Sequence, residues 1–301
     1  MARYVTPQME KISDKNRRSK DKDYSFWREA WRRIRRNRTG VLGMVIIIIL
    51  LLIALFAQII TPYNPTTIDL MHANQTPNWS HLFGTDELGR DILSRCLAGT
   101  QVSLPMGIAG AISSVILGGI LGLIAAFFMG RIDHLIMRVM DVLQAIPGIL
   151  MAIAVVATIG IGIFQLLLAM AISSLPMFAR AVRAAVLTVR DSEYVEASRT
   201  IGARTVRLML RHIMPNCVGH LIIFAVGSIS GSILIISTLS FLGLGVAPPT
   251  PEWGAMLSAG KTYIQSYPHM VIFPGLMIMI TVFAFNLFGD GVRDALDPKM
   301  R

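Results

Sequence analysis

The sequence predicts an all-α, polytopic membrane protein with about six transmembrane helices. Hydrophobic residues make up 53% of the 301 residues, charged residues make up only 15%, and the mean hydropathy is +0.59. Ordinary soluble domains carry roughly a quarter charged residues. The apolar residues also form blocks of about 20 residues or more, the length that a helix needs to cross a bilayer. Together these observations disfavour a soluble enzyme.

The spans follow the apolar blocks in order. They are expected at 41–60, at 101–130, twice within 142–179, at 217–239 and at 270–288. The first block lies behind a 40-residue basic tail and is longer than a signal-peptide core of about 7–15 residues, so we expect it to be a retained span. Within the third block, Gly160–Gly162 predicts a hairpin between two spans, because glycine tolerates the turn and interrupts a helix.

The positive charges predict the orientation of the chain. With the N-terminus in the cytoplasm and six alternating spans, the cytoplasmic segments hold 25 of the 28 Lys and Arg residues. The two long outer loops, 61–100 and 240–269, hold only Arg90, Arg95 and Lys261. This distribution obeys the positive-inside rule and places both termini in the cytoplasm. Basic loops that face anionic lipid also account for the net charge of +10, so no nucleic acid is expected as a partner.

The predicted spans contain no Asp, Glu, Lys or Arg. Ion-coupled carriers usually need intramembrane carboxylates or similar groups, and ion-selective pores tend to show charged rings or a carbonyl filter. An autonomous channel or carrier is therefore disfavoured. Small residues such as Gly118, Gly122 and Ser228 fit either close helix packing or a weakly polar passage. Both interpretations remain open, and the translocation path is not assigned.

The patterns that would indicate catalysis or nucleotide binding are incomplete. The fragment GKT at 260–262 lacks the first glycine of a P-loop, because Ala255 occupies that position, and it falls in an outer loop. The motifs HExxH and GxSxG are absent, and the six histidines lack metal-ligand spacing. Asp86 and Glu87 follow Thr85, so we expect them to favour a helix N-terminus rather than to perform acid–base chemistry. No catalytic, cofactor-binding or metal-binding residue is predicted.

A polar insertion, EYVEASRTIGARTVRLMLRHIMP at 193–215, separates the fourth and fifth predicted spans. Asp191 and Ser192 are plausible caps for a short helix, and Glu193 and Glu196 suit its first turn. Gly202 can end this helix in a left-handed conformation. The insertion therefore begins with a short, capped helix outside the membrane.

A second short helix is expected from Ala203. It would carry Ile213 on an apolar side and Arg207 and Arg211 on another side, and Pro215 would stop it ahead of the fifth span. By composition alone, the two helices could equally be a basic amphipathic hairpin that lies on the lipid surface.

The order of residues in the insertion resembles the EAA loop of ABC importer permeases. The matching residues are Glu196, Ala197, Ser198, Gly202, Ala203, Ile213 and Pro215, with Ser198 in place of the second alanine of the motif and Met214 in place of its leucine. In that family the loop forms a coupling helix, which docks in a cleft of the cytoplasmic ATPase and transmits its movement to the spans. The resemblance implies the same role here, with Glu196 as a charge for the partner and the small residues permitting close docking.

Three further segments resemble the dipeptide/oligopeptide branch of these permeases, and more narrowly its C-type subunit. They are HLFGTDELGRDILSR (81–95), SFLGLGVAPPTPEWGAMLS (240–258) and FNLFGDGVRDALDPKMR (285–301). The likeness covers about 25–301. It implies the type I ABC importer permease fold.

Two regions are expected on this basis. Residues 1–40 form a cytoplasmic basic tail and an interfacial helix, in which aromatic and apolar residues recur at helical spacing among arginines. Residues 41–301 form the permease domain, with the coupling loop at 191–215. The outer stretch 246–269 is either a contact for a binding protein or a structural lid, and the sequence leaves both interpretations open.

The resemblance implies a permease subunit of an ATP-driven importer that moves di- or oligopeptides across the bacterial cytoplasmic membrane without being an enzyme itself. Nickel and glutathione importers share the branch and are the alternatives; a polytopic membrane enzyme is the alternative from another class. The implied partners are a second homologous permease, two cytoplasmic ABC ATPases that bind ATP and Mg, an extracytoplasmic peptide-binding protein and membrane lipid. No cofactor is expected in this chain.

Overall fold

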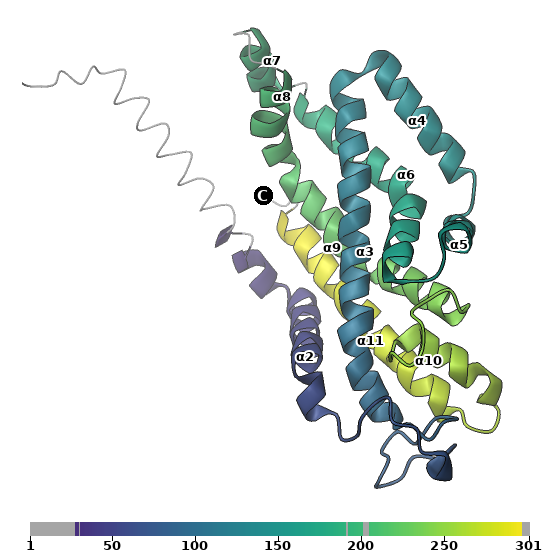
Figure 1. The fold of residues 1–301 in the computed structure, drawn as a ribbon. Coiled ribbons are helices and arrows are strands. Elements are labelled where there is room, and N and C mark those ends of the chain that lie inside the picture. The colour runs from purple at the N-terminus through teal and green to yellow at the C-terminus, as the bar shows by residue number, and fades with distance from the viewer. Residues whose placement is uncertain (1–27, 30, 191, 201–204, 297–301) are drawn as a thin grey trace, which may run out of the picture.

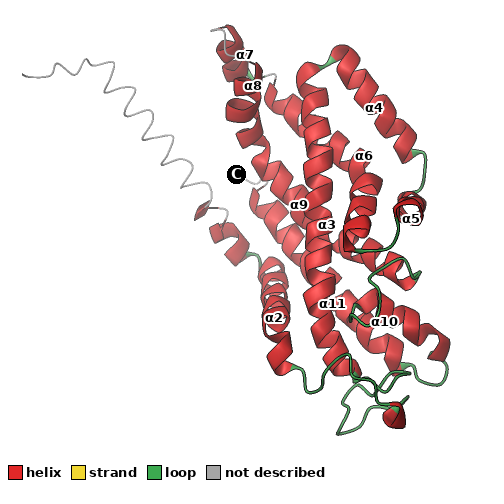
Figure 2. Ribbon diagram, in the orientation of Figure 1, coloured by secondary structure: helices red, strands yellow, loops and turns green. Residues whose placement is uncertain are grey.

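The computed structural model describes residues 28–29, 31–190, 192–200 and 205–296, and most of these residues are helical (Figure 1). In chain order the elements are α2 (Arg38–Ile60), the 3-10 turn η1 (Leu70–His72), α3 (Ile92–Phe128), α4 (Gly130–Gln144), α5 (Gly148–Ile159), α6 (Ile163–Arg190), α7 (Glu193–Thr200), α8 (Thr205–Leu208), the π-helical turn η2 (Met209–Ile213), α9 (Met214–Phe241), α10 (Trp253–Gly260), the 3-10 turn η3 (Lys261–Tyr263) and α11 (His269–Leu296). Figure 2 shows helices joined by loops, without a sheet among the described residues.

Five helices, α2, α3, α6, α9 and α11, are long and apolar enough to cross a membrane. A sixth span is possible only as the pair α4–α5, which is bent by 90°. The predicted fold class is confirmed, but the first span expected within 142–179 is not one straight helix. Helix α5 has 12 residues, about 18 Å of helix, whereas a hydrocarbon core is about 30 Å thick. The helix is interrupted at Pro147 because proline disfavours a helical conformation in the residue before it.

Helix α3 occupies the centre of the bundle and packs along α6, with further contacts to α9 and α2 (Figure 1). It begins at Ile92, well before the predicted boundary at 101, because Asp91 caps it: Oδ2 accepts hydrogen bonds from the backbone N and the hydroxyl of Ser94, both at 2.7 Å. Cys96 is consequently buried in α3 rather than placed in a loop.

The expected capping role of Thr85, Asp86 and Glu87 is wrong. The Thr85 hydroxyl donates to the carbonyl of His72, and Asp86 Oδ2 accepts from Arg90 Nε at 2.7 Å. These residues lie in a loop that begins and ends at an isolated bridge between Thr85 and Asp91. The acidic side chains therefore stabilise the loop ahead of α3 rather than a helix N-terminus.

Glycines set the distances between several helices. A Cβ atom on Gly43 of α2 would lie 2.6 Å from the carbonyl oxygen of Ala284 in α11, and a Cβ on Gly118 of α3 would lie 3.1 Å from the backbone N of Ala179 in α6. Gly122 meets the same turn of α6. Close packing is thus the role of Gly118 and Gly122, one of the two interpretations that the sequence left open.

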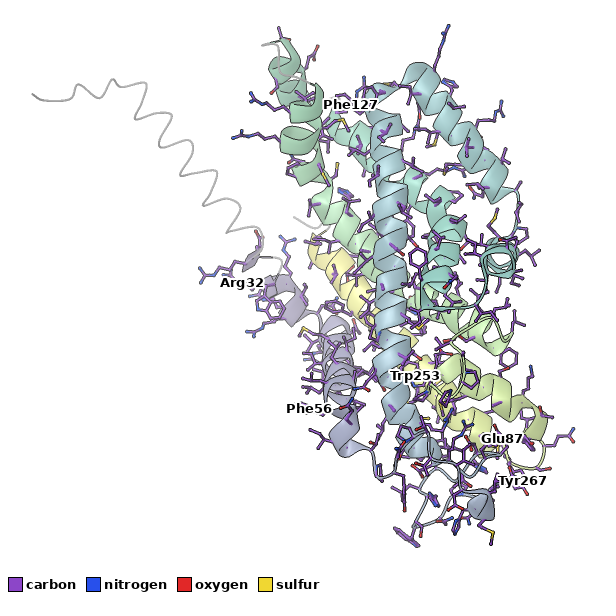
Figure 3. All side chains as sticks on the ribbon, viewed as in Figure 1. Arg32, Phe56, Glu87, Phe127, Trp253 and Tyr267 are labelled. Atoms are coloured by element: carbon purple, nitrogen blue, oxygen red, sulfur yellow. The ribbon has the colours of Figure 1, made fainter. Side chains whose placement is uncertain are left out.

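The opposite ends of the bundle have different structures. Helices α7 and α8 lie at one end, called here the α7 end, and α10 lies near the other, called the α10 end (Figure 1). At the α10 end, Trp253 is fully buried against α3, and its Nε1 donates to the carbonyl of Cys96 at 3.0 Å (Figure 3). The carboxylate of Glu252, also fully buried, accepts from the backbone N of Gly254 and Ala255 at 3.0 and 2.8 Å and so caps α10.

The hydroxyl of Ser103 joins this cap to α3. It donates to Glu252 Oε1 at 3.2 Å and accepts from the backbone N of Trp253 at 3.1 Å. Every one of these contacts is internal. The side chains at 252 and 253 are therefore buried in packing within the chain and are not exposed for contact with a binding protein.

The helix contact at Gly43 predicts a direction of change on substitution. Gly43→Ala should lower the thermal unfolding midpoint of the purified protein, because overpacking typically costs about 1–3 kcal/mol and exceeds the helix-propensity gain of about 1 kcal/mol. The control is Gly119→Ala, whose Cβ would make an ordinary 3.8 Å contact with Val182. An equal effect of both substitutions would contradict the packing at Gly43.

The burial of Trp253 predicts a second difference. Trp253→Ala should lower the free energy of unfolding by about 3–5 kcal/mol, since it removes a large core side chain. Trp79→Ala is the matched control, because Trp79 is 96% exposed. Thermal unfolding followed by tryptophan fluorescence measures both variants, and an unchanged midpoint for Trp253→Ala would contradict the packing of Trp253 against α3.

Candidate functional site

The polar insertion begins where α6 ends. The Ser192 hydroxyl donates to the carbonyl of Val189 at 2.5 Å, and the carbonyl of Ser192 accepts from the backbone N of Val195 and Glu196 at 3.0 and 3.2 Å. Helix α7 then starts at Glu193, with both Glu193 and Glu196 in its first turn as predicted. Carboxylates at this position complement the positive end of the helix.

One side of the insertion is an apolar anchor. Val195 of α7, Leu208 of α8 and Ile213 of η2 have at most 1% of their surface exposed. They share one buried cluster with the end of α3 and with α6 and α9, where Figure 3 labels Phe127. The buried members are Ala126, Phe127, Val182, Val186, Val195, Leu208, Ile213 and Cys217.

The other side of the insertion is polar and exposed. The exposed residues there include Glu193, Glu196, Thr200, Arg207 and Arg211. Charges of both signs thus lie on a surface whose underside is packed against three long helices. A force applied to this surface reaches α3, α6 and α9 through the buried cluster, because a close-packed interior transmits strain.

The helical path into α9 is continuous, so the expectation that Pro215 stops the second helix is wrong. In the π-helical turn η2, the backbone N of Met214 reaches back five residues to the carbonyl of Met209. Proline lacks an N–H group and is tolerated in the first turn of a helix. Pro215 accordingly lies in the first turn of α9, directly after the π-helical turn η2. Single π-helical turns within helices are frequent at functional sites.

The predicted site residues fall into different environments. Glu196 and Pro215 are exposed, Ser198 is half-buried, and Ile213 is buried in the anchor. Ala197 lies in α7, whereas Gly202 and Ala203 fall outside the described residues. Glu196 is therefore the predicted residue best placed for a partner, and Ile213 supports the insertion from beneath.

Two ion pairs beside the site were not predicted. Arg183 of α6 donates through Nε and Nη2 to the two carboxylate oxygens of Asp133 in α4, at 2.7 and 2.6 Å. Arg180 donates to Asp141 at 2.6 Å. Asp133 and Arg183 lie 50 residues apart in the sequence, and Asp141 and Arg180 lie 39 residues apart. The sequence indicates these pairs only by charged residues that border apolar blocks. They hold α4 against the helix that leads into the insertion.

The described residues contain no group of three His, Cys, Asp or Glu side chains that could hold a metal ion. The described residues of the site instead form an exposed, charged surface that is attached to the long helices by a buried apolar cluster.

Comparison with known proteins identifies this architecture. Residues 118–301 match the family model of the binding-protein-dependent transport system inner membrane component, and residues 25–77 match the N-terminal TM domain of oligopeptide transport permease C. The chain is 45% identical over 276 residues to the glutathione transport system permease protein GsiD of Pectobacterium atrosepticum, a match that covers 91% of this chain and 92% of that protein. It is 46% identical over 276 residues to the protein of the same name from Escherichia coli O6:K15:H31, with 91% of each chain covered.

A solved structure of the methionine ABC transporter MetNI in an inward-facing conformation shares the fold, with a TM-score of 0.56 and 16% identity over 67% of this chain and 96% of that chain. The family match covers more than half of the chain, and the curated relatives match nearly all of it. The chain therefore belongs to the inner membrane components of binding-protein-dependent transport systems, the permease subunits of ABC importers.

Proposed function

We propose that this permease subunit imports small peptides, glutathione among them, and that the exposed face of the polar insertion couples transport to ATP hydrolysis. The observation that carries the coupling role is the two-sided construction of the described residues of the insertion, 192–200 and 205–215. Glu196 is exposed on one side, while Val195, Leu208 and Ile213 are buried on the other. A surface that only rested on lipid would not need three fully buried residues beneath it.

The partners follow from the family. The subunit is not itself an enzyme, because the family consists of membrane components and the ATPase activity belongs to partner subunits. We assign ATP and Mg to two cytoplasmic ABC ATPases that dock on the insertion. A second homologous permease would complete the path, and an extracytoplasmic binding protein would deliver the solute at the α10 end. The excess of Lys and Arg in 1–40, 130–141, 180–216 and 289–301 supports a cytoplasmic location of these segments, and so of both termini.

The proposed solute rests on the relatives. Proteins about 45% identical to this chain are named glutathione transport permeases, and the N-terminal region matches a domain of an oligopeptide permease. Glutathione is itself a tripeptide, so both names point to a small, polar, flexible solute. The predicted spans, which contain no Asp, Glu, Lys or Arg, suit such a solute because fixed charges would hold it in the path. Nickel import is the second candidate within the branch.

The coupling role predicts the effect of reversing one exposed charge. Glu196→Lys should reduce ATP-driven uptake by the assembled transporter at least tenfold, because it places a like charge against a surface that is complementary to a carboxylate. The measurement is uptake into proteoliposomes together with co-purification of the ATPase subunits. The control is Asp290→Lys, which reverses an exposed carboxylate near the same end in α11 but outside the insertion. Uptake unaffected by Glu196→Lys would contradict the coupling assignment.

The solute class has its own test. Proteoliposomes that contain the complete transporter and its binding protein should accumulate labelled glutathione in an ATP-dependent manner, and unlabelled short peptides should compete. Labelled nickel ions in the same assay provide the comparison. Accumulation of nickel without accumulation of glutathione or peptides would overturn the solute assignment and leave the coupling role intact.

A further inference from the structure

Arg190 joins the end of α6 to the end of α3. It is the last residue of α6, just before the chain enters the polar insertion. Its Nη1 donates to the carbonyl of Ala126, which lies in the last turn of α3 next to Phe127 (Figure 3), at 3.4 Å. The side chain is half-buried, and its Nε is buried without a hydrogen-bond partner among the described residues. The guanidinium group is therefore directed toward α3 rather than into solvent.

The end of α3 is a favourable place for this charge. The last carbonyl groups of a helix lack partners within the helix, and the helix dipole gives this end a partial negative charge. The backbone N of Met129 donates to the carbonyl of Ala125 at 3.0 Å, and Arg190 donates to the next carbonyl along the chain. A hydrogen bond from a guanidinium group is charge-assisted, so it is stronger than one between neutral groups.

Among the described residues of α3 and α6, this is the only hydrogen bond that joins the two helices. The rest of their contact consists of close packing at Gly118 and Gly122 and of the apolar cluster beneath the insertion. Apolar contacts have no preferred direction, so they resist separation of two helix ends more than they resist sliding. The hydrogen bond from Arg190 to Ala126 therefore fixes the start of the insertion relative to the last turn of α3.

We propose that Arg190 is a positioning residue for coupling, which makes the start of the insertion and the last turn of α3 move as one unit when the ATPases displace the insertion. This inference rests on the proposed coupling role of the insertion. A displacement of α7 reaches the end of α6 because Ser192, directly before α7, is hydrogen-bonded to the carbonyl of Val189. From there the guanidinium group of Arg190 carries it to α3, the central helix of the bundle.

A cap that serves only α3 is the other role for this contact. Water is sufficient for such a cap, because the neighbouring Phe128 and Met129 are 50 and 42% exposed. The donor comes instead from a different helix, at the residue where that helix meets the insertion. At this position the hydrogen bond links two segments that would otherwise move independently, which a local cap does not do.

Distance measurements in the assembled transporter test the proposal. Spin labels are attached to the variants Phe128→Cys and Thr200→Cys in one chain, at exposed positions at the end of α3 and in α7. The native Cys96 and Cys217 are buried and so are protected from the label, and the partner subunits are made without cysteine. Electron paramagnetic resonance then gives the distribution of distances between the two labels, without nucleotide and with the slowly hydrolysed analogue ATPγS.

The labelled protein that carries no further substitution should give the same narrow distribution in both nucleotide states. Arg190→Gln should broaden the distribution and make it depend on nucleotide. It should also lower the amount of labelled glutathione imported per ATP hydrolysed by about fivefold or more, as expected for the loss of a typical coupling between sites. Arg190→Lys keeps the positive charge and should retain most of the coupling. Arg138→Gln, at an exposed arginine of α4, is the control and should change neither measurement.

A distribution that changes with nucleotide before Arg190 is substituted would overturn the proposal, and so would equal distributions with and without Arg190→Gln. Reduced stability of Arg190→Gln with unchanged uptake per ATP would show that the residue only caps α3. Co-purification separates this proposal from the coupling role itself. Arg190→Gln should retain the ATPase subunits, whereas Glu196→Lys tests whether they dock on the insertion.

Discussion

The packing of α3 against α6 is the contact on which the rest of the structure depends. Gly118 and Gly122 allow the two helices to approach until backbone meets backbone. Helix α3 also reaches both ends of the bundle: Trp253 lies against its first turns, and Phe127 joins the cluster beneath the polar insertion near its last turn. A long helix with fixed neighbours at both ends behaves as a rigid strut, because a close-packed interior has low compressibility.

The distribution of charge completes this picture. In hydrocarbon every backbone polar group must find a partner within its own segment, which leaves helices as the only choice for these apolar blocks. Charged side chains are consequently confined to the ends of the bundle. At the α10 end, the ion pair between Asp86 and Arg90 stabilises the loop ahead of α3. At the α7 end, charged side chains form ion pairs and an exposed surface. A permease built in this way has no Asp, Glu, Lys or Arg in its predicted spans to couple to an ion gradient, and its supply of energy must arrive at a surface.

The features that could be predicted from sequence are those with a local cause. Apolar runs gave the positions of most spans, Gly160 marked the turn before α6, and the two glutamates marked the start of α7. The residue order of the EAA type also located the insertion. Long-range features could not be predicted. Thr85 and Asp91 are both residue types that cap helices, and the hydrogen bond from the Thr85 hydroxyl to the carbonyl of His72 shows that Thr85 is used in the loop instead. The bidentate contact of Arg183 with Asp133 spans 50 residues and has no periodic signature.

The π-helical turn η2 determines how the residues before it are rotated about the helix axis relative to α9. A π-helical turn contains one residue more than an α-helical turn, and one helical residue corresponds to about 100° of rotation and 1.5 Å of rise. The five residues Met209–Ile213 therefore set the angular position of α8 relative to α9. Removing a single residue there would swing Leu208 out of its buried site and turn Arg207 inward, so the length of this turn, as much as its composition, determines which face the insertion offers.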